Sequence, residues 1–260
     1  MRIAIFSDVH GNLTALETVL ADIKQQAPDT VAFAGDLCYF GARPAGCIER
    51  IQGEVDLFVY GNTDEIIFDP PSVDETLPEE KRQRWESFYK SFDWYRDKLT
   101  PEQIGWLSRM PFSHRISPTA SAKDDLLITH ANPKDVNVPI APPANVQTEL
   151  LGEVKIERDD EVMAGLFAGV ETAILAYGHV HLNNVQEYNG ITLANISATS
   201  NPMARDGTAR YGILTWTKLA GWEIEMRQVR YNFGKEQELL SFLQPPKWEM
   251  ISKGLGKSVF

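Results

Sequence analysis

The first twelve residues constrain the fold most, because they place two metal-binding types of side chain at the end of an apolar strand. Residues 2–7 form a short apolar run typical of a buried strand, and Asp8, His10 and Asn12 follow at once. In extended backbone, side chains two residues apart point to the same side, so Asp8 and His10 can hold one ion with little rearrangement. An Asp two positions before a His is also common in surface turns. The pair therefore indicates a metal site only if further candidate metal ligands follow the ends of other strands.

The same unit recurs twice in the next fifty residues. A helix with one apolar face begins after Asn12, which is a suitable N-cap. A strand over residues 30–34 then ends at Gly35-Asp36, and a strand over 55–60 ends at 61–64, with a short helix after Pro44 between them. Three strand–helix units in series predict a parallel sheet whose ligand-bearing loops gather at the carboxyl ends of its strands. The residues expected to meet there are Asp8, His10, Asp36 and Asn62.

Residues 65–125 differ in character and predict a helical cap inserted beside this edge. An acidic, proline-containing loop opens the segment, and a stripe of large apolar residues at helical spacing follows. Such a stripe favours packing over ligand binding. Thr100, Pro101 and Gln103 form a capping box that predicts a second helix, which ends before Pro111. A cap in this place shapes the pocket that selects substrate. The stripe consists of Trp85, Phe88, Tyr89, Phe92, Tyr95 and Leu99.

Histidines follow the strands of the second half. We expect the sheet to resume with a strand over 125–129 that ends in His130. After a loop over 131–144 and a helix over 160–168, a strand over 172–177 ends in Gly178-His179-Val180-His181. Two imidazoles at this spacing form a second pair of candidate ligands.

Tight turns separate the last strands. Asn189-Gly190 predicts a hairpin of strands 185–188 and 191–196, and strands over 211–217 and 222–229 follow. We expect these late strands to form a second mixed sheet packed on the first. The tail over 233–260 predicts a helix through Phe242 and then an extended segment without chemistry of its own.

Length and composition limit the class of protein. We interpret residues 1–260 as a single domain with enough apolar content for a large core. No apolar stretch is long enough to span a bilayer, and no signal-peptide pattern follows Met1, so we expect a cytoplasmic location. Cys38 and Cys47 are too few for a disulfide framework. The net charge of −11 makes nucleic acid an unlikely partner and favours small soluble substrates. The sequence does not indicate which oligomeric state the protein adopts.

Five motifs, each at the end of a predicted strand, resemble those of the calcineurin-like metallophosphoesterases. They span residues 2–181 in the order of that family, and they are Asp8-x-His10, Gly35-Asp36, Gly61-Asn62 with Asp64, His130, and Gly178-His179-x-His181. Gly41, Pro44 and Asn195-x-Ser197 are similar to patterns of its small bacterial and archaeal phosphodiesterase-like branch. The resemblance implies an α/β fold, a four-layer αββα sandwich of two mixed sheets, with a dinuclear metal site.

The resemblance also implies roles for these residues. Asp36 would bridge two divalent ions, such as Mn, Fe, Zn or Ni, and a hydroxide held between the ions would attack phosphorus in line. Asn62 would help to stabilise the developing charge. Four of the five histidines occupy motif positions, which argues against ordinary core or surface roles for them. The ligands implied are Asp8, His10 and His181 for the first ion, and Asn62, His130 and His179 for the second.

One departure from the family pattern bears on substrate choice. Many members carry a histidine that protonates the leaving oxygen where this chain has Thr63, and threonine is no general acid at neutral pH. We therefore expect a preference for phosphodiesters, with Asp64 left to hydrogen-bond its own loop. His114 is a candidate proton donor from the cap or, equally well, part of an exposed strand edge. Arg43 and Arg205 are candidate contacts for phosphate oxygens.

The sequence thus predicts a metal-dependent phosphodiesterase acting on a small phosphodiester or nucleotide-like substrate. One alternative is a catalytically weak binding or scaffold protein of the same fold, which the complete set of ligands disfavours. A phosphomonoesterase or a nuclease is a further alternative. The acidic balance and the absence of a basic aromatic stretch argue against the nuclease.

Overall fold

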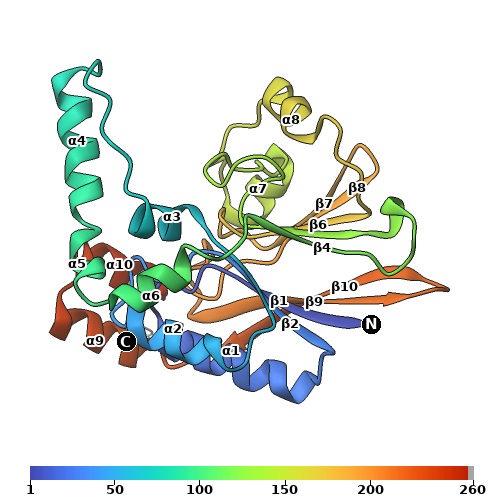
Figure 1. Cartoon of the computed structure of the whole chain (residues 1–260), viewed down its shortest axis with the longest axis horizontal. Coiled ribbons are helices and arrows are strands. Elements are labelled where there is room, and N and C mark those ends of the chain that lie inside the picture. Colours follow the sequence, from blue (N-terminus) through green and yellow to red (C-terminus); the bar gives the residue numbers. More distant parts are fainter. Residues whose placement is uncertain (257–260) are drawn as a thin grey trace.

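Strands that are apolar on both faces need a cover on each side, and the computed structural model, which describes residues 1–256, supplies it in four layers (Figure 1). Two five-stranded sheets face each other through an aliphatic cluster that includes Ile3, Ile5, Ile128 and Ile174. A second cluster lies under helices on the outer face of the first sheet, and a third lies under helices on the second sheet. The predicted αββα sandwich of two mixed sheets is therefore confirmed.

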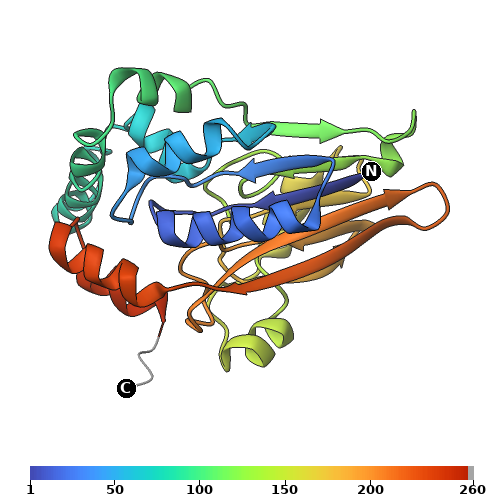
Figure 2. The ribbon, with the colours of Figure 1, turned by 90° about the horizontal axis from the view of Figure 1, so that it is seen from below.

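The first sheet contains the predicted parallel strands and two strands from the end of the chain. Its strand order is β10-β9-β1-β2-β3, with β1, β2 and β3 parallel and β9 antiparallel to β1. The bounds are Arg2–Phe6 for β1, Thr30–Ala34 for β2, Leu57–Val59 for β3, Thr208–Thr217 for β9 and Gly221–Arg230 for β10. The long β9–β10 hairpin runs beneath α1 and extends past it (Figure 2).

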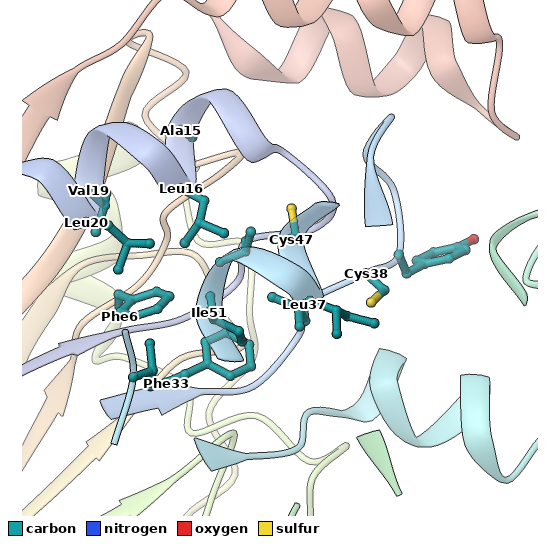
Figure 3. Packing of buried hydrophobic residues seen from close by; sticks show 14 of the residues in the cluster. Phe6, Ala15, Leu16, Val19, Leu20, Phe33, Leu37, Cys38, Cys47 and Ile51 are labelled. Carbon is teal, nitrogen blue, oxygen red and sulfur yellow. The ribbon is translucent and has the colours of Figure 1, made fainter. Parts of the chain in front are cut away.

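Helices α1, Leu13–Gln26, and α2, Pro44–Gln52, cover the outer face of this sheet. Asn12 caps α1 as predicted, because its Oδ1 accepts a bond of 3.0 Å from the Ala15 amide. Leu16 and Leu20 of α1 pack toward Phe6 and Phe33 of the sheet (Figure 3).

The second sheet has the strand order β4-β5-β6-β8-β7. Its strands are β4 (Ser113–Ile116), β5 (Leu126–Thr129), β6 (Ile174–Tyr177), β7 (Asn184–Tyr188) and β8 (Ile191–Asn195). Helices α7, Ala144–Leu151, and α8, Asp160–Phe167, lie over its outer face. The helix expected over 160–168 is confirmed, whereas α7 was not predicted.

Two expectations about strand placement are wrong. The strand expected over 125–129 does not resume the first sheet, since β5 pairs with β4 and β6 in the second. The late strands do not form one sheet either, because β7 and β8 join the second sheet while β9 and β10 complete the first. The reason is that β1 would otherwise be an edge strand with unpaired amides, and β9 supplies its missing partner.

The segment over 65–125 is mainly helical but also contains the edge strand β4, in agreement with the alternative that placed His114 on an exposed strand edge. Its helices are α3 (Asn62–Phe68), α4 (Glu79–Lys90), α5 (Asp93–Arg96) and α6 (Pro101–Leu107), and a 3₁₀ turn spans Ala122–Asp124. The aromatic stripe is split near Ser91: Phe92 and Tyr95 are fully buried, whereas Trp85 on the projecting α4 is 45% exposed. The Thr100–Gln103 capping box is confirmed by reciprocal bonds of 3.0 and 3.2 Å.

The tail after β10 consists of two helices. The helix predicted through Phe242 is α9, Phe233–Leu243, and the segment expected to be extended contains α10, Trp248–Leu255. That expectation was therefore wrong, and residues 257–260 of the predicted tail lie outside the described part. Among residues 1–256, no helix combines the length and the apolar character needed to cross a membrane.

Candidate metal centre

Five strands from both sheets end at one place and bring all seven candidate ligands together. Strands β1, β2 and β3 of the first sheet meet β5 and β6 of the second at their carboxyl ends, as expected for α/β folds. Five of these ligand residues have a positive φ, which costs non-glycine residues about 1 kcal/mol each or more and is typical of functional sites. The five are Asp8, His10, Asp36, His179 and His181, with φ between 48° and 68°.

The first group consists of Asp8, His10 and His181. The His10 Nε2 lies 3.0 Å from the His181 Nε2, and the His181 Nε2 lies 3.3 Å from the Asp8 Oδ1. The His10 Nε2 lies 3.9 Å from the same carboxylate oxygen. Three donor atoms therefore converge within the span of one cation.

Asp36 lies between this group and a second one. Its Oδ2 is 3.8 Å from the His10 Nε2 and 3.5 Å from the His130 Nε2. The Asn62 Oδ1 lies 3.1 Å from the His130 Nε2 and 3.1 Å from the His179 Nδ1. A single carboxylate oxygen thus faces imidazoles of both groups, which is the arrangement that a bridging ligand requires.

Backbone carbonyls fix the tautomers of these imidazoles. The Nδ1 atoms of His10, His130 and His181 lie 2.9–3.0 Å from carbonyl oxygens, which only accept hydrogen bonds, so each Nδ1 carries the proton and donates. Each Nε2 then presents a lone pair to the site. His179 is reversed, because its Nε2 donates to the Asn137 carbonyl at 3.1 Å and its Nδ1 faces Asn62. The three carbonyl oxygens are those of Tyr39, Ala34 and Asn201.

This arrangement fits divalent cations. The His10 and His181 nitrogens are 3.0 Å apart, a spacing that would be repulsive for two unprotonated imidazoles and therefore needs either a proton or a metal ion between them. Ligand nitrogens that bind one ion at 2.0–2.1 Å and about 90° to each other are themselves about 3 Å apart. The mixed set of carboxylate, amide and imidazole donors suits Mn, Fe, Zn and Ni alike.

Burial and the two carboxylates have opposite effects on the protonation of the imidazoles in the centre. Burial lowers the pKa of His10 and of His179 to about 4, so both are neutral at pH 7. Burial opposes protonation of His130 and His181 as well, but Asp36 and Asp8 outweigh it and raise their pKa. Burial also opposes the ionised form of Asp8, yet the neighbouring His181 outweighs it and lowers the pKa of this carboxyl. The same carboxylates would favour a bound cation.

Asp64 and Thr63 hold the loop that carries Asn62. Asp64 is fully buried and accepts bonds of 2.8 to 3.1 Å from the amides of Asp36, Leu37 and Gly61, which confirms the predicted loop role. Burial and the charge of Asp36 raise the pKa of Asp64 to about 7. The Thr63 amide donates to the Asp36 Oδ1 at 2.9 Å, while the Thr63 hydroxyl is buried without a partner in the described structure.

The structure brings one of the three outlying candidates to the site. Arg205 lines a pocket together with His179 and His181. The Arg43 guanidinium instead lies 2.7 Å from Glu236, which argues against a phosphate contact. His114 lies on the edge strand β4 opposite Ile128, so the structure supports the strand-edge interpretation over that of a proton donor.

Two kinds of group that shape the metal centre, backbone carbonyls and motif glycines, could hardly be recognised from the sequence. Backbone carbonyls that orient the imidazoles do not depend on residue type. The glycines of two motifs have a packing role, since a Cβ at Gly61 would lie closer than 3.0 Å to Asp36, and one at Gly178 closer than 3.0 Å to Asp8. Only the position of each glycine within its motif hinted at this role.

A two-sheet αββα fold that gathers carboxylate, amide and imidazole donors at its strand ends is suited to metal-dependent hydrolysis. The sequence model of the calcineurin-like phosphoesterases matches residues 1–193. The chain therefore belongs to the calcineurin-like phosphoesterase family, whose members depend on metal ions.

Similar proteins come from bacteria and archaea. A metallophosphoesterase of Sphaerobacter thermophilus has a TM-score of 0.67 and 22% identity over 98% of both chains. A hypothetical protein of Pyrococcus horikoshii has a TM-score of 0.69 and 14% identity over 99% of both. These two structural similarities confirm the αββα fold of the chain. An uncharacterised protein of Methanocaldococcus jannaschii is 29% identical over 137 residues, which are 51% of this chain and 50% of that protein. The chain thus matches about half the length of this curated relative.

Proposed function

We propose that this protein is a phosphodiesterase that uses two divalent ions held by the seven converging side chains. The observation that carries the proposal is the position of the Asp36 Oδ2, which faces His10 on one side and His130 on the other. Asp8 and His181 would complete the first site, and the remaining three residues the second. These three are Asn62, His130 and His179.

When bound, the ions supply an activated water and neutralise charge on the phosphoryl oxygens. The chain's own residues orient the reaction. The Asn62 Oδ1 points at the imidazoles of His130 and His179, which leaves its amide nitrogen to donate to a phosphoryl oxygen. Arg205 supplies a positive charge at the rim of the adjoining pocket. Asp64 holds the Asn62 loop against Asp36 through backbone amides.

The preference for diesters rests on the absence of a proton donor at Thr63. A missing general acid typically costs 10²- to 10⁴-fold, and the loss is greatest for poor leaving groups. Phosphodiesters with acidic leaving groups would therefore react best, and simple alkyl monoesters worst. A scaffold protein with an impaired site is disfavoured because no ligand position has been lost. The cytoplasmic location expected from the sequence stays a prediction.

The test is a leaving-group series assayed with metal-reconstituted protein whose metal content is measured by elemental analysis. Wild-type protein should hold close to two ions per chain and cleave substituted phenyl diesters with a steep dependence on the pKa of the phenol. Thr63→His should make that dependence shallower, because it places a group that can donate a proton next to Asn62. Thr63→Asn, of similar size but without an acid, is the matched control.

Two outcomes would contradict the proposal. Metal content well below one ion per chain would remove the dinuclear centre. A wild-type rate that does not vary with the leaving group, or an unchanged slope in Thr63→His at full metal loading, would mean that Thr63 does not set the diester preference.

A further inference from the structure

We infer that the pocket beside His179 and His181 receives an apolar ester group of the substrate, and that the C-terminal helix α10 forms one of its walls. The inference rests on the proposed function and narrows its substrate class to phosphodiesters with one bulky aromatic or aliphatic ester group. Such a group would lie in the pocket while the phosphorus lies at the metal centre.

The size and lining of the pocket support this class of ligand. Its volume is about 460 Å³, within the range of sites that enclose small organic ligands. Most side chains in its wall are apolar, and the imidazoles of His179 and His181 form the side toward the metal centre. A methyl ester would leave most of this volume unfilled. The apolar side chains of the wall include Phe40, Ile156, Met203, Met250 and Ile251.

The charges of the residues that line the pocket also favour a neutral apolar ester group. Arg205 is the cationic side chain of the lining, and none of the described residues that line the pocket is acidic. A neutral apolar group attached to an anionic phosphodiester matches this pattern, because its charge stays near Arg205 and the metal centre. A second negatively charged substituent placed against Met203 and Met250, away from Arg205, would have no partner for its charge.

The loop opposite α10 ties the pocket to the metal centre. The Asn201 carbonyl accepts from the His181 Nδ1 at 2.9 Å, and the Met203 amide donates to the His181 carbonyl at 3.0 Å. The pocket is therefore built on the same loop that orients a candidate metal ligand. A substrate anchored in it would have its phosphorus at a fixed offset from that ligand.

Helix α10 is held in place by packing, so the pocket is preformed. Ile251 and Leu255 are buried against α9 and the loop after β2, and the Gln237 side chain donates to the Ser252 carbonyl at 2.8 Å. Gly254 lies so close to Asn201 that a Cβ there would approach its side chain closer than 3.0 Å. Met250, by contrast, remains 57% exposed although it is apolar. A flexible thioether at a pocket wall can adapt to an incoming apolar group.

The experiment compares two diesters that share the p-nitrophenolate leaving group, methyl p-nitrophenyl phosphate and phenyl p-nitrophenyl phosphate. Both diesters lose the same leaving group, and any intrinsic difference in their reactivity is the same for every protein variant, so a change in the ratio between variants reports on the pocket. Burying a phenyl ring should favour the phenyl diester roughly 10-fold or more in kcat/KM for the wild-type protein. Met250→Ala should reduce this ratio roughly 3- to 10-fold, and Met203→Ala, on a different element, should reduce it as well. Phe242→Ala removes an 83% exposed side chain of α9 outside the pocket and should leave the ratio unchanged.

Equilibrium binding separates this inference from the proposed function. Diphenyl phosphate and dimethyl phosphate are titrated into metal-loaded protein by calorimetry, which needs no turnover. Tighter binding of diphenyl phosphate that weakens in Met250→Ala supports the pocket, even if no diester is hydrolysed and the proposed activity fails. Equal kcat/KM for the two p-nitrophenyl diesters, together with equal affinity for the two probes, overturns the inference. A ratio that neither methionine variant changes overturns it too, provided that both melt within a few degrees of wild type.

Discussion

Gly178→Ala should damage the metal centre without removing any ligand. Gly178 precedes His179 and lies against the first strand end, so that an added Cβ would lie 2.5 Å from the Ser7 Oγ and closer still to the Asp8 Oδ2. These two atoms already share a hydrogen bond of 2.5 Å, and the Asp8 carboxylate also accepts from the His179 amide at 3.1 Å. The new methyl group can be accommodated only if the carboxylate shifts.

Two effects of different size follow. Overpacking of this kind costs about 1–3 kcal/mol, which lowers the melting temperature by about 2 to 12 °C for a chain of this size. Disturbing the groups that hold a metal ligand in position typically lowers the metal affinity about 10- to 100-fold. Because metal binds the folded state, that loss removes about 1.4–2.7 kcal/mol of additional stabilisation at saturating metal. The melting point should therefore fall further with metal present than with chelator present.

The assay measures thermal unfolding with and without chelator, metal content by elemental analysis, and hydrolysis of bis(p-nitrophenyl) phosphate. Gly165→Ala is the matched control, since no atom lies within 4 Å of the added Cβ and the residue lies inside α8. It should bind metal normally and gain roughly 0.5–1 kcal/mol of stability. If Gly178→Ala matches this control in metal content and activity, then the close contact with Asp8 does not govern metal binding, and the reasoning is refuted.

Two further predictions concern the metal ligands and a partly buried ion pair. Asp36→Asn should lower occupancy of both ions together, whereas His181→Ala should mainly lower that of the first, and equal mild losses in metal titrations would contradict the bridging role. The hydrogen bond from Arg227 lowers the pKa of Asp22, so the pair stabilises the fold above the unfolded pKa of about 3.9 and loses this effect as pH falls through the folded value. Asp22→Asn should therefore be less stable than wild type at pH 7 by under about 1 kcal/mol, and the difference should vanish once the pH falls below the folded pKa of Asp22. A difference independent of pH in denaturant titrations would exclude this cause.

The sequence was most informative where local pattern and topology agree. Strand ends carry the ligands, and parallel strands in series must align their carboxyl ends, so Asp8, Asp36 and Asn62 were expected to meet from spacing alone. Capping residues such as Asn12 and Thr100 act on amides two or three positions away, and both caps formed as predicted. The order of the motifs, and not any one of them, identified the family.

Pairing and packing between segments that are distant in the sequence were harder to predict. Whether β5 joins the first or the second sheet depends on which edge is free, and periodicity within residues 125–129 carries no information on that point. Helix α10 was missed because Pro245 and Pro246 indicate an extended segment, whereas burial of Ile251 and Leu255 against α9 determines the observed structure. Tertiary packing thus overrode the local signal there.

The central position of β1 determines when the metal centre can mature during folding. Arg2 pairs with Thr215, and the Ser7 and Asp8 carbonyls accept from the amides of Thr199 and Ser200. The strand that is synthesised first thus obtains its second neighbour only from β9, about two hundred residues later. Pairings of such high contact order close slowly, and an open strand edge can mispair until they form. The ligands Asp8 and His10 therefore leave the ribosome early but reach their final geometry among the last parts of the chain.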